Sequence, residues 1–142
     1  MDNLDHKENI ADFETLLDYI LENIPSTSII FVSTIPDMNP NTKRVYSWFD
    51  YYRITEDLNN VYNDEKVQNK VKELINRFNK DINSLVNERQ KVGQNVRIVD
   101  LNSVINDINT QLKDGVHPND VGFKEIGKYL TNIIGNYLNR KK

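Results

Sequence analysis

The sequence predicts an α/β fold, in which a parallel sheet is covered by helices. Two short runs, residues 28–33 and 96–101, are rich in β-branched residues and apolar on both faces, as expected for buried parallel strands. Three longer segments carry apolar residues at steps of three and four, which is the spacing of amphipathic helices. A strand, a helix and a strand in this order predict one right-handed crossover with parallel strands.

The first helix is expected over residues 9–24, and Pro25 and Ser26 end it. One side of this helix is apolar and is expected to pack on the core: Ile10, Phe13, Leu16, Leu17, Ile20, Leu21 and Ile24. After the first strand, residues 35–63 are irregular, with Pro36 and Pro40 near the start. A structureless loop of this length is uncommon in a compact domain, so the segment either is functional or contains a short helix.

Helical spacing returns over residues 66–91, and Gly93 is placed to cap the carboxyl end of this helix. The second strand, residues 96–101, is followed by a short stretch, residues 103–112, for which helix is one option. The last helix is expected over residues 119–138. Its apolar residues are expected on the core side: Val121, Phe123, Ile126, Leu130, Ile133, Ile134, Tyr137 and Leu138.

Composition excludes several classes of function. The chain of 142 residues has the size of one domain, and no apolar run approaches the ~20 residues that span a bilayer, so we expect no membrane partner. A net charge of −3 and a pI of about 5.4 argue against nucleic-acid binding. With no cysteine and two histidines, we expect neither a metal site nor a cofactor. The acidic start carries no secretory signal, so the compartment stays open; a signal peptide would lie in a segment preceding Met1.

The candidate catalytic residues are Asp114 and His117, in the segment Asp-Gly-Val-His-Pro-Asn. An Asp bound to one ring nitrogen fixes the tautomer of a general base, and the intervening Gly115 permits the tight turn that would join the two side chains. Pro118 holds His117 in extended backbone, and Asn119 is a good N-cap for the last helix. An isolated D-x-x-H is usually an ordinary turn, but this one follows a parallel strand, on the side where open α/β sheets bind ligands.

The motif D-G-V-H-P-N-D-x-G-F-x-x-I-G, beginning at Asp114, resembles the last conserved block of the SGNH or GDSL esterase/lipase superfamily. The nearest resemblance is to the acetyl-xylan-esterase-like carbohydrate esterases. It extends over roughly residues 10–138: residues 29–36 resemble the family's middle strand and its Pro-ended loop, and residues 78–100 resemble the helix and strand that follow. The aromatic-rich stretch 41–65 is longer than the family pattern.

The resemblance implies a three-layer, flavodoxin-like SGNH hydrolase fold, present here as its C-terminal portion over residues 1–142. It further implies a serine hydrolase of ester bonds, with Asp114 as orienting acid and His117 as general base. The implied substrate is an acetylated polysaccharide or another small ester. The family's G-D-S nucleophile block and its G-x-N-D oxyanion block are not in this sequence. We therefore expect the chain alone to be inactive, because the base has no hydroxyl to activate.

Three alternatives accompany this interpretation. Ser33, at the carboxyl end of the first predicted strand, could serve as a surrogate nucleophile, although a hydroxyl there is more often structural. The aromatic cluster, which includes Trp48, Tyr51 and Tyr52, is either a sugar-stacking surface or the packing of a long loop. Finally, the chain could be a non-catalytic interaction module that keeps the scaffold, and the strand edge left open by the missing strands would pair with another chain.

Overall fold

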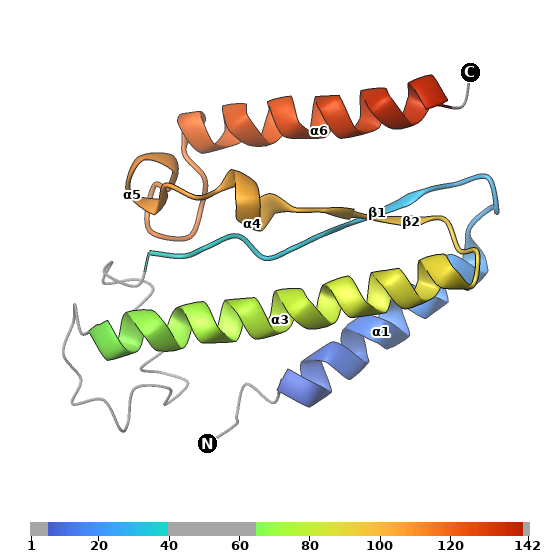
Figure 1. Ribbon diagram of the computed structural model, residues 1–142, viewed down its shortest axis with the longest axis horizontal. Coiled ribbons are helices and arrows are strands. Elements are labelled where there is room, and N and C mark those ends of the chain that lie inside the picture. The colour runs from blue at the N-terminus through green and yellow to red at the C-terminus, as the bar shows by residue number, and fades with distance from the viewer. Residues whose placement is uncertain (1–5, 40–64, 141–142) are drawn as a thin grey trace.

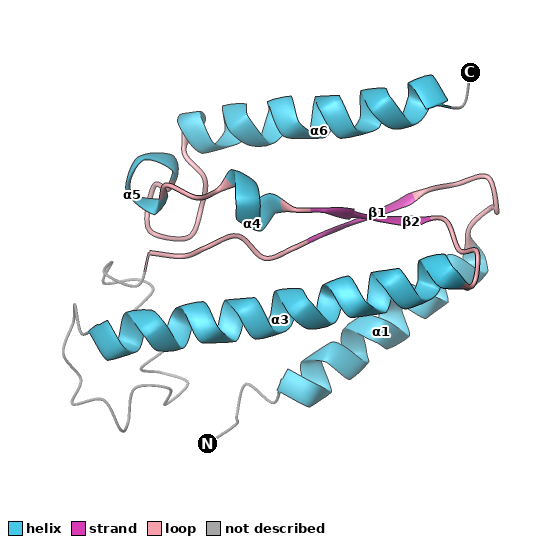
Figure 2. Ribbon diagram, viewed as in Figure 1, coloured by secondary structure: helices cyan, strands magenta, loops and turns pink. Residues whose placement is uncertain are grey.

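The computed structural model describes residues 6–39 and 65–140, which form helices on both sides of a small sheet (Figures 1 and 2). The elements, in chain order, are α1 (His6–Asn23), β1 (Ile30–Ser33), α3 (Glu65–Lys91), β2 (Val96–Val99), α4 (Leu101–Val104), α5 (Ile108–Gln111) and α6 (Asp120–Arg140). Helix α6 covers one face of the sheet, and α1 and α3 cover the other. The aromatic stretch 46–52 lies outside the described residues.

The two strands run parallel, as the order of elements predicted. Their register pairs Ile30 with Val96 and continues to Ser33 with Val99. Helix α3 makes the connection between them. It ends at Lys91 and is capped by Gly93, which has a φ of 84°. The N–H of Gly93 donates to Gln90 O at 3.0 Å and that of Gln94 donates to Arg89 O at 3.0 Å, which is the Schellman pattern of a helix cap.

The main core lies between the sheet and the α1/α3 layer. Its buried members come from α1, both strands and α3: Leu17, Val32, Ile82, Val86 and Val96. A second, smaller cluster forms around Val71 and Ile75 of α3, and Met38 and Val116 pack against it. This second cluster matters for the site, because it places Val116, between Asp114 and His117, against the body of the protein.

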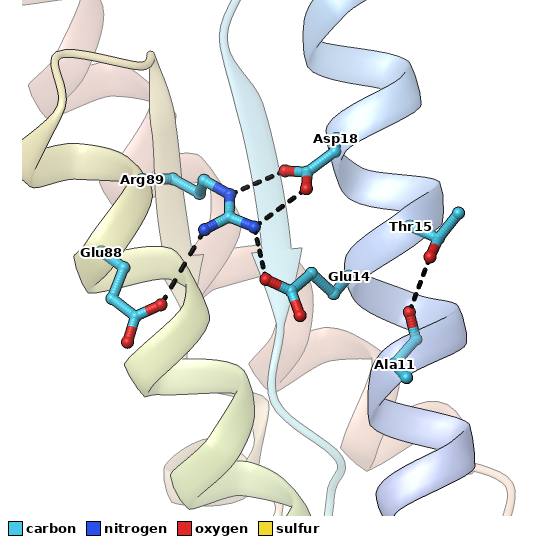
Figure 3. A network of polar contacts seen from close by, with 6 residues as sticks. All are labelled: Ala11, Glu14, Thr15, Asp18, Glu88 and Arg89. Carbon is cyan, nitrogen blue, oxygen red and sulfur yellow. Dashed lines mark hydrogen bonds and ion pairs between the residues drawn. The ribbon is translucent and has the colours of Figure 1, made fainter.

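Helices α1 and α3 are also joined by ion pairs, in which Arg89 of α3 reaches across to α1 (Figure 3). Its Nε lies 2.7 Å from Asp18 Oδ1, and its Nη2 lies 2.7 Å from Glu14 Oε1. The hydrogen bonds to Asp18 and to Glu14 raise the pKa of Arg89, so the guanidinium keeps its charge. The contact fixes which flank of α1 faces α3.

Two expectations about secondary structure and burial were wrong. Asp100 and Leu101 were placed in the second strand, but that strand ends two residues earlier, at Val99. Asp100 is the N-cap of α4, where its carboxylate accepts a hydrogen bond from Ser103 N, and Leu101 begins the helix. Apolar residues expected in the core are exposed instead: Leu16 on α1, and Val121, Phe123, Ile134 and Leu138 on α6. They are exposed because the described part of the chain places no element against those flanks. None of the described helices is both long and apolar enough to cross a membrane.

Candidate functional site

The segment between α5 and α6 closes on itself as a compact turn. Lys113 N donates to His117 O at 2.8 Å, Asn119 N donates to Gln111 O at 2.9 Å, and Leu112 forms an antiparallel bridge with Pro118. Gly115 takes a φ of 86°, a left-handed conformation that favours glycine. The sequence expectation of a tight turn at this glycine is therefore confirmed.

The turn brings the side chains of Asp114 and His117 together. Asp114 Oδ1 accepts from His117 N at 2.9 Å and from Val116 N at 3.2 Å. The other carboxylate oxygen, Oδ2, lies 2.8 Å from His117 Nδ1. Since a carboxylate can only accept, Nδ1 carries the hydrogen in this pair, and Nε2 of the neutral ring is left as an acceptor. The Asp114 side chain is 23% exposed and that of His117 is 59% exposed, so the carboxylate is partly enclosed while much of the histidine side chain is accessible.

The base of the turn is fixed by buried or half-buried amides. The Gln111 side chain is buried, and its Oε1 accepts from Asn106 N at 3.0 Å and from Asp107 N at 2.8 Å, while its Nε2 donates to Val104 O. On the other side of the turn, Asn119 Oδ1 accepts from Gly122 N at 3.0 Å, which is the N-cap of α6 that the sequence predicted. The sequence analysis did not predict that Gln111 supports the turn, because a single glutamine in a polar stretch has no pattern that marks it as buried.

The loop that follows β1 also supports the turn. Asn39 N donates to Gly115 O at 2.8 Å. This loop is in turn clamped by Asn79 of α3, whose Oδ1 accepts from Ile35 N at 2.6 Å and whose Nδ2 donates to Ile35 O at 2.9 Å. Asn79 was also missed by sequence reasoning. It did leave a signal, because it is a polar residue that falls among the buried positions 75, 82 and 86 of an otherwise apolar helix side.

The hydroxyl groups at the carboxyl end of β1 differ in what they contact. Thr34 is buried; its Oγ1 donates to Asp100 Oδ1 at 3.0 Å and accepts from Asn102 N at 3.0 Å, so this hydroxyl ties the two strand ends together. Ser33 is exposed, and within the described residues no hydrogen bond joins it to His117. The geometry thus brings together Asp114 and His117 and leaves Ser33 apart from them.

Beside the turn lies a cleft of about 550 Å³, which neither Asp114 nor His117 lines. Its lining residues are Lys113, Pro118, Asn119, Asp120, Val121 and Phe123. The described ranges contain no cluster of three or more His, Asp or Glu side chains able to hold a metal ion. The site offers an exposed histidine whose Nδ1 is bound to Asp114, which leaves Nε2 as the acceptor nitrogen. Such a group can take a proton from a hydroxyl and return it to a leaving group.

Comparison with known proteins adds two matches. Residues 4–130 match the family model described as GDSL-like Lipase/Acylhydrolase, a stretch that includes Asp114 and His117. A "Multidomain esterase" from Ruminococcus flavefaciens is 34% identical over 123 residues. That alignment covers 87% of this chain but 12% of the relative, so the chain spans only a small part of the protein it matches. No solved structure matches the chain significantly.

Proposed function

Because the chain belongs to the GDSL-like lipase/acylhydrolase family, we propose that it supplies the acid–base half of a serine esterase. The observation that carries the proposal is the Asp114–His117 pair, with 2.8 Å between Oδ2 and Nδ1 and with Asp114 Oδ1 held by two backbone N–H groups. Those backbone bonds orient the carboxylate before any substrate arrives. In this role Asp114 positions the ring and His117 transfers the proton.

The proposed reaction is acyl transfer through a serine. His117 Nε2 accepts the serine hydroxyl proton as Oγ attacks the ester carbonyl carbon, and Asp114 stabilises the imidazolium that forms. The same proton then goes to the leaving alcohol as the carbon–oxygen bond breaks, which leaves an acyl-enzyme. A water molecule, deprotonated by His117, attacks the acyl group, releases the acid and restores the serine.

In this proposal the serine and the oxyanion donors come from outside residues 1–142, because the chain holds neither a G-D-S nor a G-x-N-D block. Residues 1–142 then form the C-terminal portion of a single three-layer SGNH hydrolase domain, to which β1 and β2 contribute two strands. The chain by itself does not hydrolyse esters. The proposed substrates are acetyl esters of a polysaccharide, supported by the resemblance of residues 29–36 and 78–100 to carbohydrate esterases.

A covalent chimera tests the proposal. Residues 1–142 replace the corresponding C-terminal part of an active GDSL-family esterase, and hydrolysis of 4-nitrophenyl acetate is measured. The folded chimera is expected to be active and to lose activity on His117→Ala, whereas His6→Ala, which changes the other histidine, leaves activity intact.

Two results would contradict the proposal. One is a chimera whose activity survives His117→Ala; the other is ester hydrolysis by the isolated chain that disappears in His117→Ala. A folded but inactive chimera would favour the second candidate, a non-catalytic interaction module. The specific observation behind that candidate is the set of exposed apolar side chains on α1 and α6.

A further inference from the structure

A groove of about 370 Å³, here called the basic groove, lies between α6 and the edge of β2 that faces away from β1. Both strands, α3 and α6 contribute to its lining, which includes Phe31, Gln90, Arg97, Asn136, Tyr137 and Arg140. The described residues that line it include two arginines and no Asp or Glu. Because the whole chain has a net charge of −3, the basic groove is a local positive site on an acidic chain.

Neighbouring carboxylates do not neutralise the two arginines of the groove. Within residues 6–39 and 65–140, every ion pair of an arginine belongs to Arg89, on the other face of the sheet. Arg97 and Arg140 are exposed and form no ion pair with a described residue. Both guanidinium groups are therefore available to an anion from outside the chain.

The Arg97 guanidinium is held in a defined position. Its Nη1 donates to Val96 O at 2.8 Å, and Gln90 Nε2 donates to the same oxygen at 2.9 Å. Since the bond to Val96 uses Nη1, the hydrogens of Nε and Nη2 remain for a ligand, and they form the planar fork that matches a carboxylate. A group positioned before binding loses less conformational entropy when the ligand arrives. This geometry predicts a carboxylate at Arg97, with Arg140 as a second cation.

The rest of the groove suits the ring of a sugar. Tyr137 packs edge-on against Phe31, with 6.3 Å between the ring centroids, and its Oη accepts from Asn95 Nδ2 at 3.3 Å. These contacts fix an aromatic wall against which the apolar face of a sugar ring can pack. Asn136 adds an exposed side-chain amide, which can bond sugar hydroxyl groups as donor and as acceptor.

The backbone edge of β2 at this groove is closed to a peptide strand. Val96 O accepts two side-chain hydrogen bonds, and Val96 N donates to Gln94 O at 3.1 Å. Further along the strand, Asp100 N donates to Tyr129 Oη at 3.1 Å. A peptide that adds to a sheet depends on such backbone groups for its main-chain hydrogen bonds. The basic groove therefore favours a ligand that binds protein side chains, as a sugar does.

Helix α6 runs back along the sheet, away from the Asp–His turn (Figure 1). Tyr129 Oη is bonded to Asp100 N at the carboxyl end of β2, whereas Tyr137 Oη is bonded to Asn95 Nδ2 next to the amino end of that strand. The α6 residues of the basic groove come from the second half of the helix. The groove is thus at the end of the sheet opposite to His117.

The distance along α6 from Asp120, its first residue, to Asn136 is about 24 Å. A small ester at His117 cannot reach the basic groove, but a polymer can occupy both places. We propose that the basic groove binds a uronate of an acidic polysaccharide whose acetyl ester, further along the same polymer, lies at His117. The inference rests on the proposed function, because it assigns this second site to the substrate of that reaction.

Binding is tested on the full chain, without a chimera. Calorimetry titrates the 142-residue chain with an oligogalacturonate, with a neutral xylo-oligosaccharide of equal length and with a polyglutamate of equal charge. The oligogalacturonate is expected to bind at least about tenfold more tightly than either control, because the xylo-oligosaccharide lacks carboxylates and the polyglutamate lacks sugar rings. Its affinity is expected to fall as salt is added, since both arginines are exposed.

Variants locate the site. Arg97→Gln and Arg140→Gln each remove one guanidinium and are expected to weaken binding by about tenfold, whereas Arg97→Lys keeps the charge without the fork and should lie between. Val96 O keeps its bond from Gln90 in all of them. The matched control is Arg77→Gln, which removes the same charge from an exposed position of α3 outside the groove. Circular dichroism establishes that each variant keeps its helices.

Activity of the chimera separates this inference from the proposed function. In an active chimera, Arg97→Gln should raise KM for an acetylated polygalacturonate by about tenfold and leave kcat unchanged, while hydrolysis of 4-nitrophenyl acetate stays at the parent level. An inactive chimera of a chain that binds the oligogalacturonate upholds the binding site and contradicts the proposed function. The inference is overturned if the oligogalacturonate does not bind, if either control ligand binds as tightly, if Arg97→Gln and Arg140→Gln bind like Arg77→Gln, or if KM for the polymer does not change.

Discussion

Gly122 offers the sharpest test of how the Asp–His turn is held. It lies buried in the first turn of α6, directly against the last residue of α5. A Cβ built on Gly122 would overlap with the backbone carbonyl oxygen of Gln111 and would lie 3.0 Å from Pro118 Cβ. Neither neighbour is the flexible end of a side chain, so Gly122→Ala must push α6 away from the residues that close the turn.

Gly122→Ala has one destabilising effect, the overpacking against α5, and one stabilising effect, the higher helix propensity of alanine. Overpacking costs about 1–3 kcal/mol, and weakening the bond from Gly122 N to Asn119 Oδ1 costs about 1 kcal/mol more. Alanine returns up to about 1 kcal/mol through its helix propensity. The net expectation is a free energy of unfolding lowered by about 1–3 kcal/mol. Gly127 in the same helix has nothing within 4 Å of its built Cβ, so Gly127→Ala should raise stability by about 0.5–1 kcal/mol.

Urea unfolding followed by circular dichroism measures both variants, and the opposite signs make each the control of the other. An NMR spectrum of the His117 side chain reports whether the Nδ1 hydrogen bond to Asp114 survives. The reasoning fails if Gly122→Ala is as stable as Gly127→Ala, or if Gly122→Ala is destabilised while the His117 signals stay unchanged.

Three further predictions concern residues around the core and the site. Arg89→Lys should lower the free energy of unfolding by about 1 kcal/mol, because the lysine ammonium cannot bond Asp18 and Glu14 at once as the planar guanidinium does. Unchanged stability in urea would refute this. Asn79→Ala should cost about 2 kcal/mol and speed amide exchange at Ile35, because it leaves the Ile35 N–H without its partner while Ile35 O keeps the bond from Asn102 Nδ2; slow exchange at Ile35 would count against the clamp. In the active chimera, Asp114→Asn should lower kcat by as much as about 10⁴-fold, because an amide in place of Oδ2 selects the wrong His117 tautomer, and activity near the parent level would remove Asp114 from the mechanism.

Local patterns in the sequence predicted much of the fold. The strands at 30–33 and 96–99 are short, apolar and β-branched, and their parallel pairing followed from the helix between them. The tight turn at Gly115 could be predicted because the Asp, the Gly and the Pro each restrict the backbone within a few residues. The resemblance to the GDSL family was recognised mainly from the block that begins at Asp114, and the match of the family model to residues 4–130 confirms the family.

The burial of the helix sides and the support of the Asp–His turn could not be predicted, because both depend on which elements pack against each other in the fold. Helical spacing places Phe123 and Leu138 on an apolar side, but spacing does not say whether an element covers that side, and both residues are exposed. The clamp by Asn79 joins segments far apart in the chain, since Ile35 and Asn79 are 44 positions apart. The Gln111 bonds are local, at four to seven positions, but they depend on the fold of the 104–111 segment and not on a recognisable pattern of residues. The catalytic roles of Asp114 and His117 remain predictions for the chimera to test.

The locality of the acid–base pair has a consequence for folding. The local bonds that close the turn span at most nine positions, from Thr110 to Asn119, whereas the hydrogen bond between Thr34 and Asp100 spans 66. Short loops close within about 10–100 ns, whereas pairing across a long stretch of chain must first overcome a larger loss of chain entropy. The pair is therefore expected to form early and repeatedly in the unfolded chain, ahead of the sheet. In synthesis it emerges from the ribosome after both β1 and β2, yet it needs the least of the remaining chain to take its shape.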